Sequence, residues 1–288
     1  MTSKRNFTTY ISSWVPAPKG CETIHFISDI ADEFLTTKTR SVLSRLRKLP
    51  AGSLAVLDWE PEKLHTPGPE FNNIMGGYGD LMEKASFVTS AAAYDLPPTR
   101  HVLNGSEEWI HDRTVGGMTH EVTRHQGFLA PQCYFKSEED DTWWLEVVIK
   151  NCQAVNTRNV PIIPLLWTMY PPEVPDMGFK TVREQQLYDW AYKLMTLGIT
   201  SLAFWFDGYV REGGYLAEST RQPDGRDPKI DLIRRVSRKS HGNKFALSNG
   251  NPNMKLIEQY AAEDAAWAAE VVNRARQDFM SSETAVRK

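Results

Sequence analysis

The chain has 288 residues, of which 41% are apolar and 11% aromatic, a composition that supports a large core and excludes a disordered protein. Its 33 basic and 36 acidic residues give a formal net charge of −3, so no overall field favours nucleic acid or an anionic membrane as partner. The sequence contains neither the apolar run of a membrane-spanning helix nor a signal-peptide pattern. We therefore expect a globular protein that is cytoplasmic or exported by a non-classical route.

The three cysteines, Cys21, Cys133 and Cys152, are widely spaced and form no CxxC pair. An odd number of isolated cysteines is not typical of a disulfide scaffold or of a cysteine-rich zinc site, so we expect buried thiols. No repeat, low-complexity tract or long Pro/Gly/Ser linker divides the chain. One domain over residues 1–288 is the simpler interpretation.

Short apolar runs alternate with amphipathic helical stretches along most of the chain, which is the pattern of parallel βα units. The runs that predict strands are, in chain order, Phe7–Trp14, Thr23–Asp29, Ser53–Glu60, Arg100–Asn104, Gly127–Phe135, Val160–Trp167 and Thr200–Phe206. The positions that predict helices are Thr37 to Leu49, the stretch after Asp140 and Asp141, the stretch after a capping box of Thr181 and Glu184, and Asn253 to Phe279.

Strand–helix alternation of this kind fits either a doubly wound open sheet or a closed (β/α) barrel. A nucleotide-binding open sheet would be expected to carry a Gly-rich phosphate loop, and neither G-x-G-x-x-G nor G-x-x-x-x-G-K-[ST] occurs in the chain. The sequence therefore favours an α/β fold with a TIM-type (β/α) barrel, irregular and with about seven strands. The helix at 253–279 is expected to pack outside the barrel or to mediate self-association, and the oligomeric state stays open.

The most informative segment is Gly52–Glu60, an apolar run that ends in two acids separated by one residue, Asp58 and Glu60. Because side chains alternate along a strand, both acids share a face with Leu54 and Val56, at the carboxyl end where barrel active sites lie. Two carboxylates this close in a partly dry cleft cannot both ionise freely, so the pKa of one of them rises. That carboxylic acid can then supply the proton that glycosidic cleavage needs. The short separation favours retention of configuration. The alternative is that the acids cap a helix or pair with Lys or Arg.

This strand resembles the catalytic strand of the hyaluronidase family of glycoside hydrolases, in which a small apolar run leads into Asp-Trp-Glu. Later segments resemble the family in the same order: Leu129–Tyr134 its L-x-P-x-x-Y strand, Asn159–Tyr170 its late strand from Val-Pro to Tyr, and Leu197–Trp205 its final strand with a terminal Trp. The resemblance covers about residues 37–206. After the motif, Pro61–His65 replaces the Trp-Arg-Pro type of segment that helps the family bind its acidic polymer.

The resemblance implies a retaining mechanism in which the 2-acetamido group of the substrate is the internal nucleophile. Carried over, Glu60 is the acid/base, Asp58 positions the acetamido group and stabilises the charge that develops on it, and Tyr134 hydrogen-bonds that group. Trp205 forms an apolar floor for the sugar ring, while an ordinary core tryptophan is equally consistent with the sequence. No metal and no cofactor is predicted, and the expected partner is a polysaccharide or oligosaccharide.

Other residues are placed near the same rim by their position in the chain. The further substrate-binding candidates are Trp167, Tyr170, Asp207 and Tyr209. Of these, Tyr170 is equally consistent with a packing role. The Gly-rich stretch Phe71–Gly79 predicts either a mobile loop over the cleft, contributing Tyr78 or Asn72 to sugar binding, or a plain surface loop.

The sequence thus predicts a barrel glycosidase, specifically a hyaluronidase-like endo-N-acetylhexosaminidase. Two alternatives stay open. One is a non-catalytic carbohydrate-binding or structural barrel whose acids have another role, and the other is a muramidase-like cell-wall hydrolase. The fold alone does not decide among them. The sequence does not identify the glycan.

Overall fold

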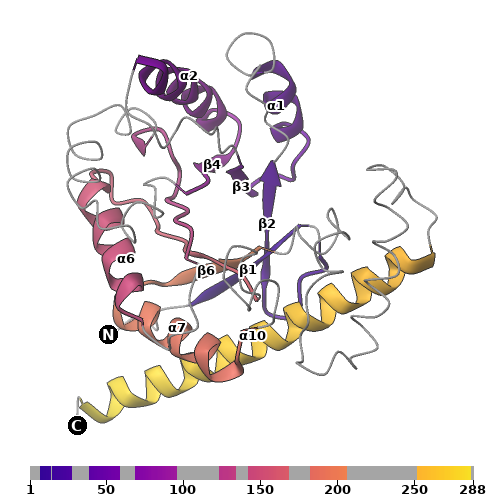
Figure 1. The fold of residues 1–288 in the computed structure, drawn as a ribbon, viewed down its shortest axis with the longest axis vertical. Helices are drawn as coiled ribbons and strands as arrows, with labels where there is room; N and C mark the ends of the chain where they lie inside the picture. Colours follow the sequence, from indigo (N-terminus) through magenta and orange to yellow (C-terminus); the bar gives the residue numbers. More distant parts are fainter. Residues whose placement is uncertain are drawn as a thin grey trace.

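In the computed structural model of the chain, the described residues are 7–13, 15–27, 39–58, 69–95, 123–133, 142–168, 182–205 and 252–286. The named strands form one sheet in the order β4-β3-β2-β1-β6-β5, and all neighbours pair in parallel (Figure 1). The strands are β1 (Thr8–Ser12), β2 (Glu22–Ile27), β3 (Leu54–Leu57), β4 (Ser90–Ala93), β5 (Leu165–Leu166) and β6 (Ser201–Phe204).

The two edges of this sheet are joined through residues 129–132, which pair in parallel with both of them. Tyr94, directly after β4, bridges Ala130, and Gln132 bridges Leu165 of β5. Backbone hydrogen bonds of 2.8 to 3.1 Å accompany the two junctions. Among the described residues, six strands and this bridged segment thus follow one another in parallel around a ring, which confirms the predicted α/β fold of TIM type.

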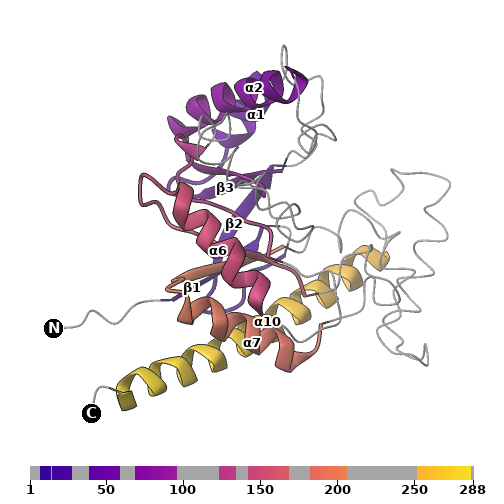
Figure 2. The same cartoon turned by 60° about the vertical axis from the view of Figure 1, so that its left-hand side comes forward.

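Helices surround this ring on the outside (Figures 1 and 2). The covering helices are α1 (Thr39–Leu46), α2 (Pro69–Ser86), α6 (Trp143–Val155), α7 (Glu184–Thr196) and α10 (Pro252–Val286). The helices α1 and α2 cover the outer face of β2, β3 and β4. The buried apolar residues that share this layer are Ile27, Val42, Leu46, Ala55, Leu57, Tyr78, Leu81, Met82, Ala85, Ala91 and Ala93.

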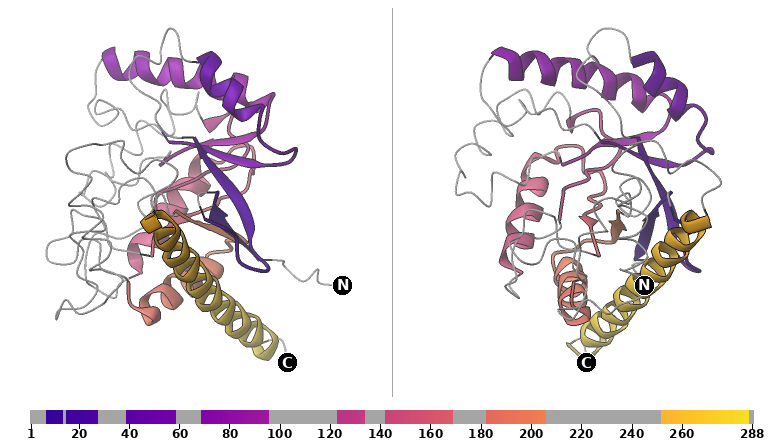
Figure 3. Two further views of the ribbon diagram at one scale, coloured as in Figure 1. Left: turned by 90° about the vertical axis from the view of Figure 1, so that its right-hand side faces the viewer. Right: turned by 45° about the vertical axis from the view of Figure 1, so that its right-hand side comes forward.

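The long helix α10 runs across the outside of the barrel, against α7 and beside β1 (Figure 3). Its buried face is made of small residues at helical spacing, which allow a close approach: Ala261, Ala265, Ala268, Val271, Val272 and Ala275. No helix in the described part of the chain is long and apolar enough to cross a membrane.

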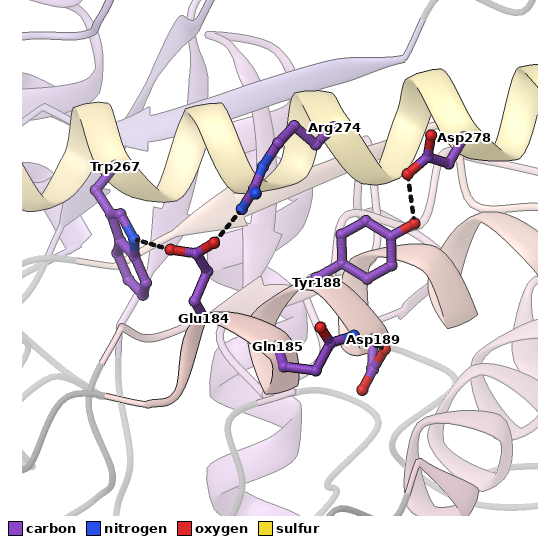
Figure 4. Close-up of polar contacts among 7 residues, drawn as sticks. All are labelled: Glu184, Gln185, Tyr188, Asp189, Trp267, Arg274 and Asp278. Atoms are coloured by element: carbon purple, nitrogen blue, oxygen red, sulfur yellow. Dashed lines mark hydrogen bonds and ion pairs between the residues drawn. The ribbon is translucent and has the colours of Figure 1, made fainter.

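Polar contacts tie α10 to α7 along the rim of this interface (Figure 4). The carboxylate of Glu184 accepts hydrogen bonds from Arg274 Nη2 at 2.6 Å and from Trp267 Nε1 at 3.4 Å. One helical turn further, the hydroxyl of Tyr188 donates to Asp278 Oδ2 at 2.7 Å. The ion pair lowers the pKa of Glu184, and the hydrogen bond to a carboxylate raises the pKa of Tyr188 to about 12.

The role predicted for Glu184 in a capping box is wrong. The N-cap residue of α7 is Arg183, without a side-chain capping bond, and Thr181 lies outside the described residues. The physical reason is competition: α10 offers the Glu184 carboxylate an arginine and an indole N–H, and a charged donor is a stronger partner than a backbone amide.

Six of the predicted strands correspond to segments of the ring, while Arg100–Asn104 lies outside the described residues. The strand β4 was not predicted, because Ser-Ala-Ala-Ala has low β propensity and no alternation. It becomes a strand because its backbone pairs with β3. Its small side chains also fit between the barrel interior and α2, where Ala91, Ala92 and Ala93 are all buried.

The loop predicted over Phe71–Gly79 is wrong, because these residues belong to α2. Each glycine in a helix interior costs about 1 kcal/mol relative to alanine. Burial of Tyr78, Leu81, Met82 and Ala85 against the sheet offsets that cost. Tyr78 is fully buried and faces β3 rather than a cleft, so it is not a sugar-binding residue.

Candidate active site at the carboxyl end of the barrel

Residues that pair across neighbouring strands point to the same side of the sheet. The pairing register therefore shows, for each segment, which side chain near its carboxyl end faces the barrel interior. The pairs that carry this assignment around the ring are Ser12–Ile24, Phe26–Val56, Val56–Ala92, Tyr94–Ala130, Gln132–Leu165 and Leu165–Ala203. The last inward-facing residues described are Ser12, Phe26, Asp58, Tyr94, Gln132, Trp167 and Trp205. We call this set the barrel mouth, the end of a TIM-type barrel at which active sites are found.

Asp58 enters the mouth from the end of β3. The alternation predicted for this strand is present as far as Asp58: Val56 packs in a different apolar cluster from Ala55 and Leu57, which face outward against α1 and α2. The backbone N–H of Asp58 donates to the carbonyl oxygen of Ile27 at 3.0 Å, which continues the β2–β3 ladder to this residue. The side chain of Asp58 is partly exposed, as a group that meets substrate must be.

Four aromatic side chains meet at the same end of the barrel, and we call them the aromatic cluster: Phe26, Tyr94, Trp167 and Trp205. The ring centroid of Trp205 lies 5.6 Å from Trp167, 5.9 Å from Tyr94 and 6.3 Å from Phe26, with the Phe26 ring nearly parallel. Trp205 is partly exposed, whereas the other three are buried. The cluster therefore holds Trp205 from several sides and leaves part of the residue accessible.

Sequence reasoning singled out Trp167 and Trp205 but not their aromatic partners. Phe26 and Tyr94 come from β2 and from the end of β4, whose strand was itself not predicted. The period of two would have placed Phe26 inward, but nothing local shows that it stacks on a residue from the far end of the chain.

Gln132 lies in the mouth between two members of the aromatic cluster, because its segment is bonded to β4 on one side and to β5 on the other. Its backbone N–H donates to Asp95 Oδ1 at 3.3 Å. Asp95 is itself buried and adopts a positive φ of 51°, which asparagine and aspartate tolerate better than most residues. Sequence reasoning missed Gln132, although alternation from Tyr134 places it on the same strand face.

Two cysteines lie close to this segment: Cys133 directly follows Gln132, and Cys152 lies on α6. Cys133 and Cys152 are fully buried and free, which confirms that they are core thiols, and Cys21 is partly buried and also free. Burial raises the pKa of Cys133 and of Cys152, and the nearby Asp95 carboxylate adds to both shifts. The thiolate form is therefore scarce at neutral pH, so neither cysteine acts as a nucleophile there.

The remaining residues of the predicted site lie outside the described residues: Glu60, Tyr134, Tyr170, Asp207 and Tyr209. The structure thus places Asp58, Trp167 and Trp205 of the predicted set at one end of the barrel, and the roles of the others stay predictions. Within the described ranges, no three His, Cys, Asp or Glu residues gather in a way that could hold a metal ion.

No family model and no curated protein matches this chain by sequence. Among solved structures, bee venom hyaluronidase is similar with a TM-score of 0.42 and 9% identity, over 79% of this chain and 71% of that chain. Bee venom hyaluronidase in complex with a hyaluronic acid tetramer gives a TM-score of 0.38 and 9% identity, over 77% and 66%. Dihydrodipicolinate synthase from Bacillus anthracis gives a TM-score of 0.32 and 11% identity, over 89% of this chain and 80% of that chain. At these values the likeness concerns the fold alone.

Proposed function

We propose that this protein is a glycoside hydrolase that cleaves an N-acetylhexosamine-containing glycan with retention of configuration. The observation that best supports the proposal is the position of Asp58. It lies on the interior face at the carboxyl end of β3, at the same end of the barrel as the partly exposed Trp205. A carboxylate beside an aromatic surface suits sugar chemistry, because the C–H face of the ring packs on the indole while the acid meets its polar groups.

In the proposed reaction, the carbonyl oxygen of the substrate's acetamido group attacks the anomeric carbon as the glycosidic C–O bond breaks. Glu60 gives a proton to the leaving oxygen, and the carboxylate of Asp58 orients the acetamido N–H and stabilises the positive charge that develops there. Glu60 then takes a proton from the water that opens the cyclic intermediate. Two displacements at one carbon leave its configuration unchanged.

The other predicted residues have supporting roles in this proposal. Tyr134 hydrogen-bonds the acetamido group, and Trp205 with Trp167 supports the sugar ring. Tyr170, Asp207 and Tyr209 contact the substrate at the rim. Strand parity in the sequence assigns Tyr134 to the face of Gln132, and it assigns Glu60 to the face of Asp58.

The test is reducing-sugar release from hyaluronan, chondroitin, chitin oligomers and peptidoglycan by the wild type and by Glu60→Gln, Asp58→Asn and Asp189→Asn. Asp189 is a matched control, since it is an acid on the outer helix α7 whose side chain accepts a hydrogen bond from Gln185 at 2.9 Å. Loss of general acid catalysis by Glu60, or of the charge stabilisation by Asp58, lowers turnover by about 100-fold or more. We expect such losses in the first two variants and full activity in the third.

Each outcome has a definite meaning. The polymer that the wild type cleaves identifies the substrate, and cleavage of peptidoglycan alone assigns the protein to cell-wall hydrolysis. If the wild type binds a glycan without cleaving any, the barrel is a binding module and the catalytic proposal fails. If Glu60→Gln retains full activity, Glu60 is not the acid.

A further inference from the structure

We infer that Gln132 is a substrate-binding residue, whose side-chain amide recognises a hydroxyl group of the sugar held by the aromatic cluster. This inference rests on the proposed function and assigns a specificity-determining contact within it. It is drawn from the burial of Gln132, from an unsatisfied atom on its side chain, and from its place in the ring.

The first observation is a buried polar atom without a partner. Gln132 is 4% exposed, and its Oε1 has no hydrogen-bond partner among the described residues. A buried amide oxygen that receives no hydrogen bond lowers the stability of the fold, so proteins rarely keep one without a use. A ligand that donates a hydrogen bond would satisfy it.

The second observation is the direction of the side chain. Leu129, on the same segment, packs with Cys152 and Val155 of α6 and therefore faces outward. Ala130 and Gln132 alternate with it and face the interior, in register with Tyr94 and Leu165 respectively.

The third observation is the backbone anchor. The Asp95 carboxylate accepts the N–H of Gln132, while the N–H of Asp95 donates to the carbonyl of Ala130 at 3.1 Å. These two bonds hold both ends of the same short stretch of backbone. The Gln132 side chain thus starts from a fixed position, as a group that discriminates between ligands requires.

The neighbours of Gln132 around the barrel indicate what kind of ligand it would bind. Tyr94 precedes and Trp167 follows Gln132 around the barrel, and both contact Trp205. A sugar packed on this cluster has its hydroxyl groups at the ring edge, where a neutral amide can accept from one hydroxyl and donate to the next. The side chain carries no titratable proton, so its contribution to affinity does not change with pH.

The test measures affinity and stability together, in the Glu60→Gln background so that substrate persists. The variants are Gln132→Met, which keeps the length of the side chain and removes the amide, and Gln126→Met as a matched control. Gln126 is also fully buried and its Nε2 also lacks a partner among the described residues, but its Oε1 accepts the N–H of Ala93 at 3.1 Å and so has a structural role. Binding of chitin oligomers and a hyaluronan tetrasaccharide is measured by calorimetry, and stability by urea unfolding without ligand.

We expect Gln132→Met to bind the glycan about 10-fold more weakly, the effect of losing one hydrogen bond, while its stability is unchanged or increased. Gln126→Met should show the opposite pattern, with lower stability and unchanged affinity. Unchanged affinity in Gln132→Met, in a protein whose parent binds glycan, overturns the inference and leaves the proposed function standing. A loss of stability with unchanged affinity shows that Gln132 is purely structural. Absence of any glycan binding or cleavage by the wild type overturns both.

Discussion

The hydroxyl of Tyr78 on α2 donates a 2.8 Å hydrogen bond to the backbone carbonyl of Leu57, the residue directly before Asp58. The same carbonyl accepts the N–H of Tyr94 at 3.0 Å. A side chain from the outer layer and a backbone group from the next strand therefore converge on the last residue of β3. This contact connects the packing of α2 to the position at which Asp58 enters the barrel mouth.

Substitution of Tyr78 by phenylalanine removes this buried hydrogen bond and keeps the ring. We expect the free energy of unfolding to fall by about 1 kcal/mol, because the carbonyl of Leu57 keeps its bond from the Tyr94 N–H. Urea denaturation checks the value. Tyr192→Phe is the control, since its hydroxyl makes only an exposed 3.3 Å contact with Ser282 and its removal should change stability little. Equal losses in both variants would contradict the assigned role of the bond.

Trp205 is expected to carry most of the apolar contact with a bound sugar. Trp205→Ala removes the ring that the rest of the aromatic cluster surrounds, and we expect glycan affinity to fall about 10-fold or more, with Trp205→Phe intermediate. Phe87→Ala serves as control, because Phe87 is 84% exposed after α2 and precedes the amino end of β4. Calorimetric titration distinguishes the variants, and a Trp205→Ala protein that binds as tightly as the wild type would exclude this role.

Asp95 combines a buried carboxylate with a left-handed backbone. Asp95→Ala removes the acceptor of the Gln132 N–H and places alanine at φ 51°, so we expect the free energy of unfolding to fall by about 2–3 kcal/mol. Asp95→Asn retains an acceptor oxygen and tolerates the backbone conformation, and we expect a smaller loss. Chemical denaturation of both variants is the measurement. An alanine variant as stable as the asparagine variant would show that neither the hydrogen bond nor the left-handed backbone contributes as expected.

The buried thiols give a prediction about reactivity. Because burial raises the pKa of Cys133 and of Cys152, we expect neither to react with a disulfide reagent at about pH 8 in the native protein. Both should react once urea unfolds the chain. Cys21 is only partly buried, so Cys21→Ser should remove whatever slow reaction the native protein shows. Rapid native labelling that persists in Cys21→Ser would show that the core around the barrel opens readily.

Tyr188 gives a prediction about pH. Its hydrogen bond to Asp278 raises the pKa of the phenol to about 12, from an ordinary value of about 10. The neutral phenol is the form that donates, so its contribution to stability is complete below the unfolded pKa and is lost as the pH rises through the folded value. Ultraviolet titration of the phenolate should therefore show a tyrosine of high pKa in the wild type that is absent from Tyr188→Phe. In Asp278→Ala that pKa should return toward its ordinary value.

Much of the barrel could be predicted because its signals are local. The period of two in Leu54–Asp58 identifies an inner and an outer face without reference to any other strand, and the packing of Ala55 and Leu57 against α1 and α2 agrees with it. The absence of a Gly-rich phosphate-binding motif favoured a barrel over a nucleotide-binding open sheet. The thiols were assigned to the core from their isolation in the sequence, and Cys133 and Cys152 are buried.

The remaining features depend on contacts between residues that are distant in the sequence. Ser90–Ala93 is a strand because β3 offers it a ladder, and Phe71–Gly79 is helical because Tyr78 and its neighbours gain burial. The contacts of Trp205 with Phe26 and Tyr94 depend on closure of the ring. Propensity and periodicity describe one segment at a time. The local pattern therefore identifies the inward face of a strand such as β3, whereas the register between segments decides which inward residues meet.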